Sequence, residues 1–172
     1  MTLLQKITLA TASLALLSGA SAASAQTYGF NRAGQAVTAS GQLIQFVAAP
    51  GVVETTCAVD IYGTVAADGK SITFDSYDGV KVSGGDLACD QSLDFPIVVT
   101  ASNASQINLD QFVVGTRAGP CQAANYKLAY AGNTATFSGA YFGVPSPICR
   151  ASGSLALTTD VGGNAVNIVT IP

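Results

Sequence analysis

The sequence predicts an all-β protein, an antiparallel β-sandwich of the immunoglobulin-like or jelly-roll-like kind, with about nine or ten short strands and two disulfides. Many short segments alternate apolar and polar residues with a period of two, which is the pattern of half-buried strands. Turn residues separate these segments at regular spacing. From Gln26 onward, no helical periodicity is longer than one turn. Short, evenly spaced strands are typical of a sandwich or a small barrel, and of the two we predict the sandwich.

Residues 1–25 have the pattern of a cleavable signal peptide. Lys6 supplies a positive charge, Ile7–Leu17 is apolar but too short to span a bilayer, and Ala23-Ser24-Ala25 is a small-residue cleavage pattern. We therefore expect residues 26–172 to form one β-sandwich domain. We expect export to the extracellular space or the cell surface, with the periplasm as an alternative, and no membrane span.

Four cysteines in an exported chain predict two disulfides, for which three pairings are possible. They lack the close spacing and the histidines of a zinc site. Closure of short local loops favours Cys57–Cys89 and Cys121–Cys149.

The first cysteine pair encloses a predicted hairpin. Val59, Ile61 and Val65 face one side of its first strand, whereas the residues between them, such as Asp60 and Tyr62, face the other. Asp68-Gly69 is a turn signal, because both residue types accept positive φ. Lys70–Phe74 then forms the returning strand.

The second pair encloses a similar unit, with strands at Cys121–Tyr130 and Thr134–Phe137 joined by a Gly132-Asn133 turn. A further echo lies outside the two units, where Ala39–Leu43 and Ala151–Leu155 both begin Ala-Ser-Gly. Duplication would explain these likenesses. Matches this short are more simply explained by hairpins with similar turns.

The remaining segments supply further strands. Pro96 makes Phe95–Ala101 an edge strand or the beginning of a strand. The other strands that we expect are Val37–Phe46, Gln106–Val114, Ser154–Thr159 and Ala165–Ile171.

Charged residues are 10% of the chain, with seven basic and ten acidic residues. Without Lys6, six basic residues remain against ten acidic ones, a net charge of −4. This balance excludes nucleic acid and anionic membrane surfaces as partners, since both require clustered Lys or Arg.

No catalytic constellation is present in the sequence. The absence of histidine removes Ser-His-Asp and Cys-His catalysis and most zinc and copper sites. Asp86, Asp90 and Asp94 are spaced like paired glycosidase carboxylates but are more simply solvated loop residues. Asp75 and Asp78, with Asp86, do not form a calcium loop. We therefore predict no enzyme, no cofactor and no metal. Five tyrosines suit sugar stacking or, more simply, packing: Tyr62, Tyr77, Tyr126, Tyr130 and Tyr141.

The order of features resembles the alkane oxidation activator PraB family of exported bacterial proteins. The matching features are the signal peptide, Thr38–Leu43, Cys57 with Gly63–Val65, Gly119–Cys121 with Cys89, and Cys149–Leu155. The resemblance implies an extracellular, non-enzymatic protein that supports growth on hydrocarbons.

These observations predict a protein that acts by contact, either with apolar material or with other surface proteins. The first alternative is a self-assembling, pilus-like fibre subunit that uses strand addition, with Thr27–Phe46 as the donor. The second alternative is a periplasmic glycan-binding module.

Overall fold

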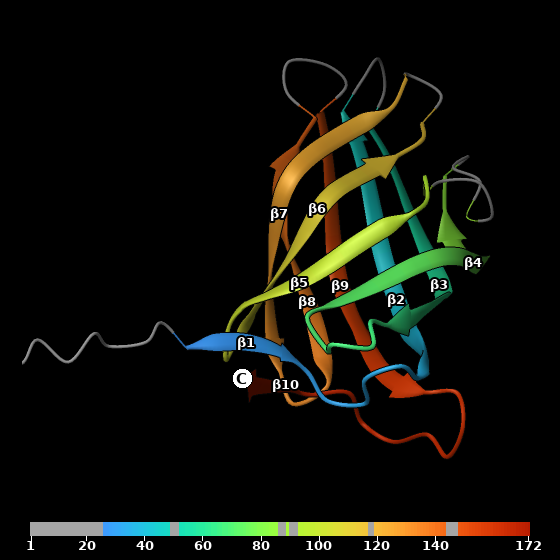
Figure 1. Ribbon diagram of the computed structural model, residues 1–172. Helices are drawn as coiled ribbons and strands as arrows, with labels where there is room; N and C mark the ends of the chain where they lie inside the picture. The colour runs from blue at the N-terminus through green and yellow to red at the C-terminus, as the bar shows by residue number, and fades with distance from the viewer. Residues whose placement is uncertain (1–25, 49–51, 86–88, 90–92, 117–118, 144–147) are drawn as a thin grey trace, which may run out of the picture.

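Eight antiparallel strands close into a barrel, and two short strands cover one of its ends (Figure 1). The computed structural model describes residues 26–48, 52–85, 89, 93–116, 119–143 and 148–172. The predicted signal peptide, residues 1–25, lies outside the described residues. The barrel strands are β2 (Ala36–Ala48), β3 (Val52–Val65), β4 (Ser71–Gly84), β5 (Ile97–Asn103), β6 (Gln106–Val114), β7 (Cys121–Ala131), β8 (Thr134–Phe142) and β9 (Ile148–Thr159).

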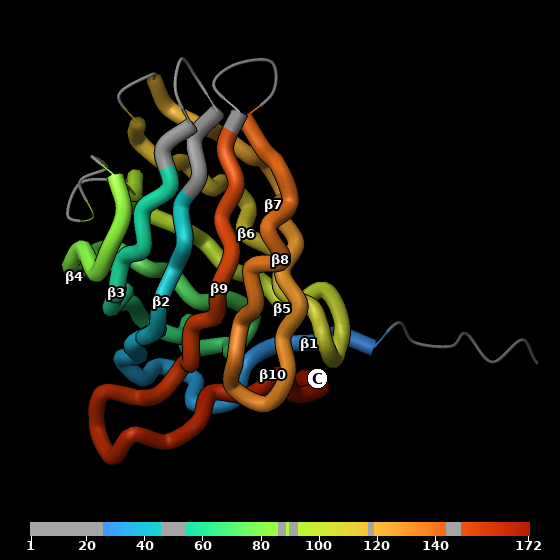
Figure 2. Tube along the Cα trace, turned by 180° about the vertical axis from the view of Figure 1, so that it is seen from behind, coloured from blue at the N-terminus to red at the C-terminus, as the bar shows by residue number. Residues whose placement is uncertain are grey.

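The barrel corrects the predicted sandwich. Each strand pairs with the next along the chain, and β9 returns to pair with β2 from Val37–Thr159 to Ala48–Ile148. Figure 2 shows β9 lying beside β2. Period-two alternation buries one face of each strand in a sandwich and in a barrel alike. The alternation therefore predicts the strands correctly but does not decide how the sheet closes.

The predicted hairpins are present. Val59, Ile61 and Val65 of β3 are buried, and Asp60 is exposed. Gly69 and Gly132 adopt positive φ values of 72° and 62° in the turns predicted for them.

The sequence echo between β2 and β9 has a structural role. Gly41 of β2 pairs with Leu155 of β9, and Gly153 of β9 pairs with Leu43 of β2, so each small residue lies beside a large buried one. A Cβ at Gly41 would lie 2.1 Å from the Ser154 carbonyl oxygen, and one at Gly153 would lie 2.2 Å from the Gln42 carbonyl oxygen. The two glycines therefore permit the close approach of the strands that close the barrel.

A two-stranded sheet covers the end of the barrel at which β2 begins. It consists of β1 (Thr27–Phe30) paired with β10 (Ile168–Ile171). The Phe30 ring packs edge-on against Tyr130 with centroids 6.4 Å apart, and the Tyr130 hydroxyl donates a hydrogen bond to the Val166 carbonyl. Burial raises the pKa of Tyr130, so its hydroxyl remains a donor. These contacts close this end of the barrel.

Two disulfides support the opposite half of the barrel. One joins Cys57 on β3 to Cys89 in the β4–β5 connection, with 5.7 Å between their Cα atoms. The other joins Cys121 on β7 to Cys149 on β9, with 6.0 Å between their Cα atoms. These are the pairs that local loop closure favours. On the chain-entropy model, each contributes roughly 3–4 kcal/mol to stability.

Candidate apolar binding site in the barrel

The barrel encloses a small cavity whose lining is wholly apolar. Its volume is about 40 Å³. Because each strand contributes alternate residues to the interior, aliphatic and aromatic positions of all eight barrel strands converge there. The lining residues are Ala39, Leu43, Ile61, Phe74, Leu93, Ile97, Val99, Ile107, Leu109, Phe112, Leu128, Ala135, Phe137 and Leu155.

Two polar residues lie next to this lining along their strands. Gln45 of β2 is 5% exposed and lies opposite Thr55 of β3, which is fully buried. Gln45 follows the inward-facing Leu43 by two residues, and Thr55 precedes Cys57 by two, so both face the interior. The Thr55 hydroxyl makes no hydrogen bond. The apolar section of the barrel therefore ends at these two residues.

Four aromatic rings fill the interior beside the junction of β7 and β8. The Phe112 ring lies 5.6 Å from Tyr126, 5.8 Å from Phe137 and 5.4 Å from Phe142, measured between centroids. The Tyr126 ring lies 5.5 Å from that of Phe142. We call these four residues the aromatic cluster. Phe112 and Phe137 also line the cavity, so the cluster forms part of its wall.

The aromatic cluster lies where backbone pairing between β7 and β8 stops. The two strands share three residue pairs, Ala129–Thr136, Tyr130–Ala135 and Ala131–Thr134, all near their hairpin turn. Beyond these pairs, the Tyr126 hydroxyl donates a long hydrogen bond of 3.4 Å to the Ala140 carbonyl. The Cys121–Cys149 disulfide joins β7 to β9. Side chains rather than a hydrogen-bond ladder hold this part of the wall, which we call the β7–β8 seam.

A second interruption lies between β4 and β5. Their pairing runs from Ser71–Thr100 to Phe74–Ile97 and stops there. Tyr77 of β4 then packs against Phe95, with ring centroids 5.5 Å apart. The Cys57–Cys89 disulfide supports this side of the barrel, and a Cβ at Gly79 would lie 2.0 Å from the Cys89 carbonyl oxygen. Each interruption thus combines an aromatic contact with a disulfide.

The cavity in this state is too small for a hydrocarbon chain. Small-molecule pockets typically have volumes of about 300–1,000 Å³, against about 40 Å³ here. An apolar molecule would enter only if side chains of the wall moved. The aromatic cluster lies at one of the two places where the backbone ladder of the wall is interrupted, and two of its rings line the cavity.

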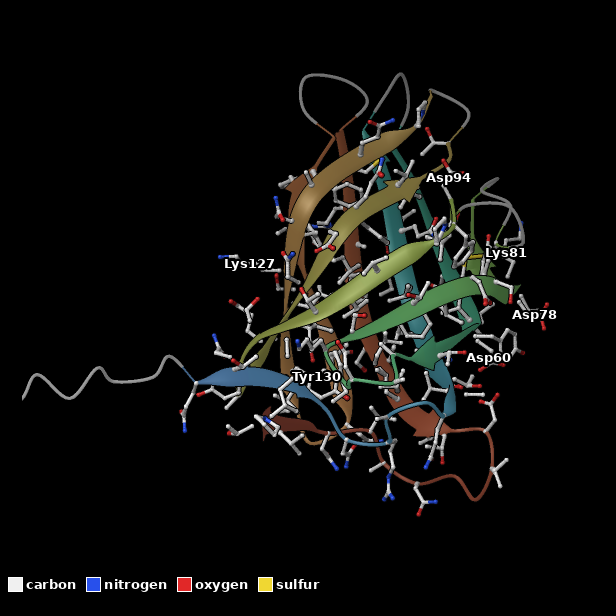
Figure 3. All side chains as sticks on the ribbon, viewed as in Figure 1. Asp60, Asp78, Lys81, Asp94, Lys127 and Tyr130 are labelled. Atoms are coloured by element: carbon white, nitrogen blue, oxygen red, sulfur yellow. A yellow bond between two sulfur atoms is a disulfide. The ribbon has the colours of Figure 1, made fainter. Side chains whose placement is uncertain are left out.

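The acidic residues singled out in the sequence do not converge. Asp75 and Asp78 are exposed on β4, Asp94 is exposed before β5, and Asp86 and Asp90 lie outside the described residues. Asp60, Asp78 and Lys81 lie along the outer side of β3 and β4 in Figure 3, away from Tyr130. Within the described parts of the chain, no three acidic, cysteine or histidine side chains gather as metal ligands would.

The tyrosines do not form a common stacking platform. The Tyr62 hydroxyl donates to the Asp78 carboxylate at 3.0 Å, and this bond raises the pKa of Tyr62. Tyr130 is buried under β1, whereas Tyr141 is 60% exposed on β8. Burial raises the pKa of the half-buried Tyr126. Tyr126 therefore belongs to the barrel wall and Tyr62 to the outer surface.

A family model described as alkane oxidation protein activator PraA/PraB-like matches residues 1–162. The chain belongs to this PraA/PraB-like family. No curated protein and no solved structure was found to match it. In the part of the chain that the structure describes, no helix is both long and apolar enough to cross a membrane.

Three rings of the aromatic cluster in this PraA/PraB-like chain were not identified from the sequence as site residues. Phe112 and Phe137 appear there as ordinary residues of two expected strands, and Phe142 lies beyond the expected end of the second. The spacing of Tyr126 and Phe137 across one predicted hairpin is the signal that places two of the rings near each other. The contact with Phe112 depends on the pairing of β6 with β7, which strand alternation alone does not predict.

Proposed function

We propose that this protein supports alkane oxidation without catalysing it, by binding an apolar molecule, an alkane, inside the barrel. The family describes activators of alkane oxidation. The two disulfides favour an exported protein, since such bonds persist in oxidising compartments. In this proposal the apolar partner is held by burial alone.

The observation that carries the proposal is the composition of the cavity lining. All of its residues are apolar, so the site offers no acid, base or nucleophile to a bound molecule. An alkane has no polar group to satisfy, and transfer from water contributes about 0.8 kcal/mol per buried CH₂. The lining therefore suits binding of an alkane and not its chemical conversion.

The β7–β8 seam provides a route into the site. Movement of the Tyr126 ring breaks one long hydrogen bond to Ala140 and exchanges contacts with other rings for contacts with the ligand. Displacement of Phe112 and Phe137 enlarges the cavity from the side that they line. The backbone ladders on either side, β6–β7 and β8–β9, remain intact in this movement.

Binding of n-octane is expected to displace a fluorescent apolar probe from the purified protein. We expect n-octane to bind faster to the Tyr126→Ala variant than to the wild type. Each aromatic pair contributes about 0.5–1.5 kcal/mol beyond burial. Loss of this contribution should raise the association rate roughly two- to tenfold. Stopped-flow probe displacement measures the rate.

Tyr62→Ala is the matched control, because Tyr62 lies on the outer face of β3. It should leave the rate unchanged. Failure of n-octane to displace the probe from both the folded wild type and Tyr126→Ala would contradict the proposal. An equal acceleration in the two variants would exclude the β7–β8 seam as the route.

Strand addition is a second candidate, favoured by the outer part of β4. Among the described residues, Asp75–Gly84 pairs with β3 only, and Val80 and Val82 on it are 68% and 53% exposed. An exposed strand edge is a template for pairing with another chain. The donor predicted from the sequence, Thr27–Phe46, has β1 paired with β10 and β2 paired on both sides, so a different donor is required. Negative-stain microscopy of the purified protein distinguishes a fibre from a monomer.

A further inference from the structure

A cleft of about 350 Å³ lies at the covered end of the barrel, outside the apolar interior. The β1–β2 connection and the β9–β10 connection form it, and both lie at the lower end of Figures 1 and 2. Its volume lies within the range of about 300–1,000 Å³ that is usual for small-molecule pockets. The lining residues are Arg32, Gln35, Ala36, Thr159, Val161 and Asn164.

The cleft has a rigid backbone frame. The Gln35 amide donates to the Arg32 carbonyl, and the Gly34 amide donates to the Val65 carbonyl, each at 3.0 Å. On the other side, Thr159 is 2% exposed, and its hydroxyl accepts from the Asn164 amide and donates to the Val161 carbonyl. The backbone positions that carry the cleft side chains are therefore fixed, and the side chains of Arg32, Gln35 and Asn164 are exposed.

Arg32 has an unusual backbone conformation. Its φ is 69°, in the left-handed region that favours glycine. A residue other than glycine there costs stability, and such outliers cluster at functional sites. The backbone strain does not itself identify a ligand. It shows that an arginine occupies a position at which glycine would be more stable.

The polar side-chain groups of Arg32, Gln35 and Asn164 have no partner among the described residues, whereas the Thr159 hydroxyl is paired. Within the described chain, the Arg32 guanidinium makes no hydrogen bond or ion pair, and the side-chain amides of Gln35 and Asn164 make no hydrogen bond. The lining contains one cation and no carboxylate. A planar guanidinium with its fork of donors matches a carboxylate.

The apolar part of the lining limits the ligand further. Ala36 and Val161 present methyl groups, and the Val161 side chain is 86% exposed. We propose that this cleft binds an alkanoate, with its carboxylate on Arg32, its oxygens within reach of Gln35 and Asn164, and its aliphatic chain along Val161. Terminal oxidation of an alkane, followed by oxidation of the alcohol and aldehyde, yields this class of compound.

The acidic residue that adjoins the lining in the sequence is engaged outside the cleft. Asp160 follows Thr159, and its carboxylate accepts a hydrogen bond of 2.6 Å from the Thr38 hydroxyl of β2. Its backbone amide donates to the Ala36 carbonyl. The carboxylate of Asp160 is therefore held at β2 and does not line the cleft.

The test is a titration of isotope-labelled protein with octanoate, followed by backbone amide chemical shifts. Shifts are expected at Arg32, Gln35 and Asn164. Arg32→Gly removes the guanidinium and relieves the positive φ, so its Tm is expected to equal or exceed that of the wild type. Its affinity for octanoate is expected to fall at least about tenfold, because hydrogen bonds to charged groups are the strong ones.

The control variant is Lys127→Ala, which removes an exposed cation on β7 (Figure 3) and should leave octanoate binding unchanged. The control ligands are acetate, octylammonium and n-octane, all of which should bind more weakly at the cleft. The proposal is overturned by an unchanged affinity in Arg32→Gly. It is equally overturned by n-octane competing as well as octanoate, or by octanoate shifts confined to the methyl groups of Leu43 and Leu155 in the barrel. If Arg32→Gly does not fold, the proposal is tested by the amide shifts of the wild type and by the octanoate affinity of Arg32→Gln. Alkane binding in the barrel has its own test, the displacement of the probe by n-octane, and its outcome does not depend on octanoate binding at the cleft.

Discussion

Val59→Asp is expected to abolish the cooperative thermal transition of the protein. Val59 lies in the barrel interior and is 4% exposed, between Cys57 and Ile61 on the same face of β3. An unpaired carboxylate there loses its hydration without gaining a partner, which costs several kcal/mol, a large part of a typical stability of about 5–15 kcal/mol. Thermal melts followed by circular dichroism measure the effect.

Asp60→Ala is the matched control on the next residue. Asp60 is exposed and lies opposite Asp78 on β4, so its removal relieves a like-charge pair. The free energy of unfolding is expected to stay within about 0.5 kcal/mol of the wild-type value. If Asp60→Ala proves the more damaging of the two, the assignment of inward-facing residues on β3 is wrong by one position.

Gly153→Ala is expected to destabilise the barrel at the β2–β9 contact by at least about 3 kcal/mol. The φ of Gly153 is 134°, and an added Cβ would lie 2.2 Å from the Gln42 carbonyl oxygen and 3.2 Å from the Leu43 Cα. Because both atoms belong to the backbone of β2, the two strands would have to separate. Chemical denaturation gives the change in free energy of unfolding.

Gly132→Ala separates the conformational cost from the steric one. Gly132 also has a positive φ, of 62°, but nothing lies within 4 Å of its added Cβ. Its replacement should cost about 1–2 kcal/mol, which is the penalty of the left-handed conformation alone. Equal losses in the two variants would show that the close approach of β2 and β9 does not contribute.

Local features of the fold follow from particular residues in the sequence. The alternation around Val59 predicts which side chains enter the interior, and Asp68-Gly69 and Gly132-Asn133 predict two turns. Pro96 marks the residue before β5. These features depend on neighbouring residues, which a sequence displays directly.

Closure of the sheet depends on residues that are distant in the sequence. From the sequence alone, the Ala-Ser-Gly echo indicates either duplication or hairpins with similar turns. In the structure its two copies are partners, with Gly41 beside Leu155 and Gly153 beside Leu43. The small residues have this meaning only when the pairing of β2 with β9 is known, which is why the alternation allowed a sandwich as readily as a barrel.

The disulfides could be predicted from the sequence, whereas the aromatic cluster and the cleft could not. The cysteine pairs are predictable because they close local loops. The aromatic cluster joins β6, β7 and β8, and the cleft at Arg32 joins two connections more than 120 residues apart in the chain. Neither arrangement leaves a motif in the sequence.

Intermolecular nuclear Overhauser effects between n-octane and methyl-labelled protein test binding inside the barrel most directly. Contacts are expected from n-octane protons to the methyl groups of Val99, Leu109 and Leu155, which line the cavity. No contacts are expected to Val80 and Val82 on the outer side of β4. Binding inside the barrel would be contradicted if the contacts were confined to those two exposed valines. It would also be contradicted if n-octane bound to saturation without a contact to any interior methyl group.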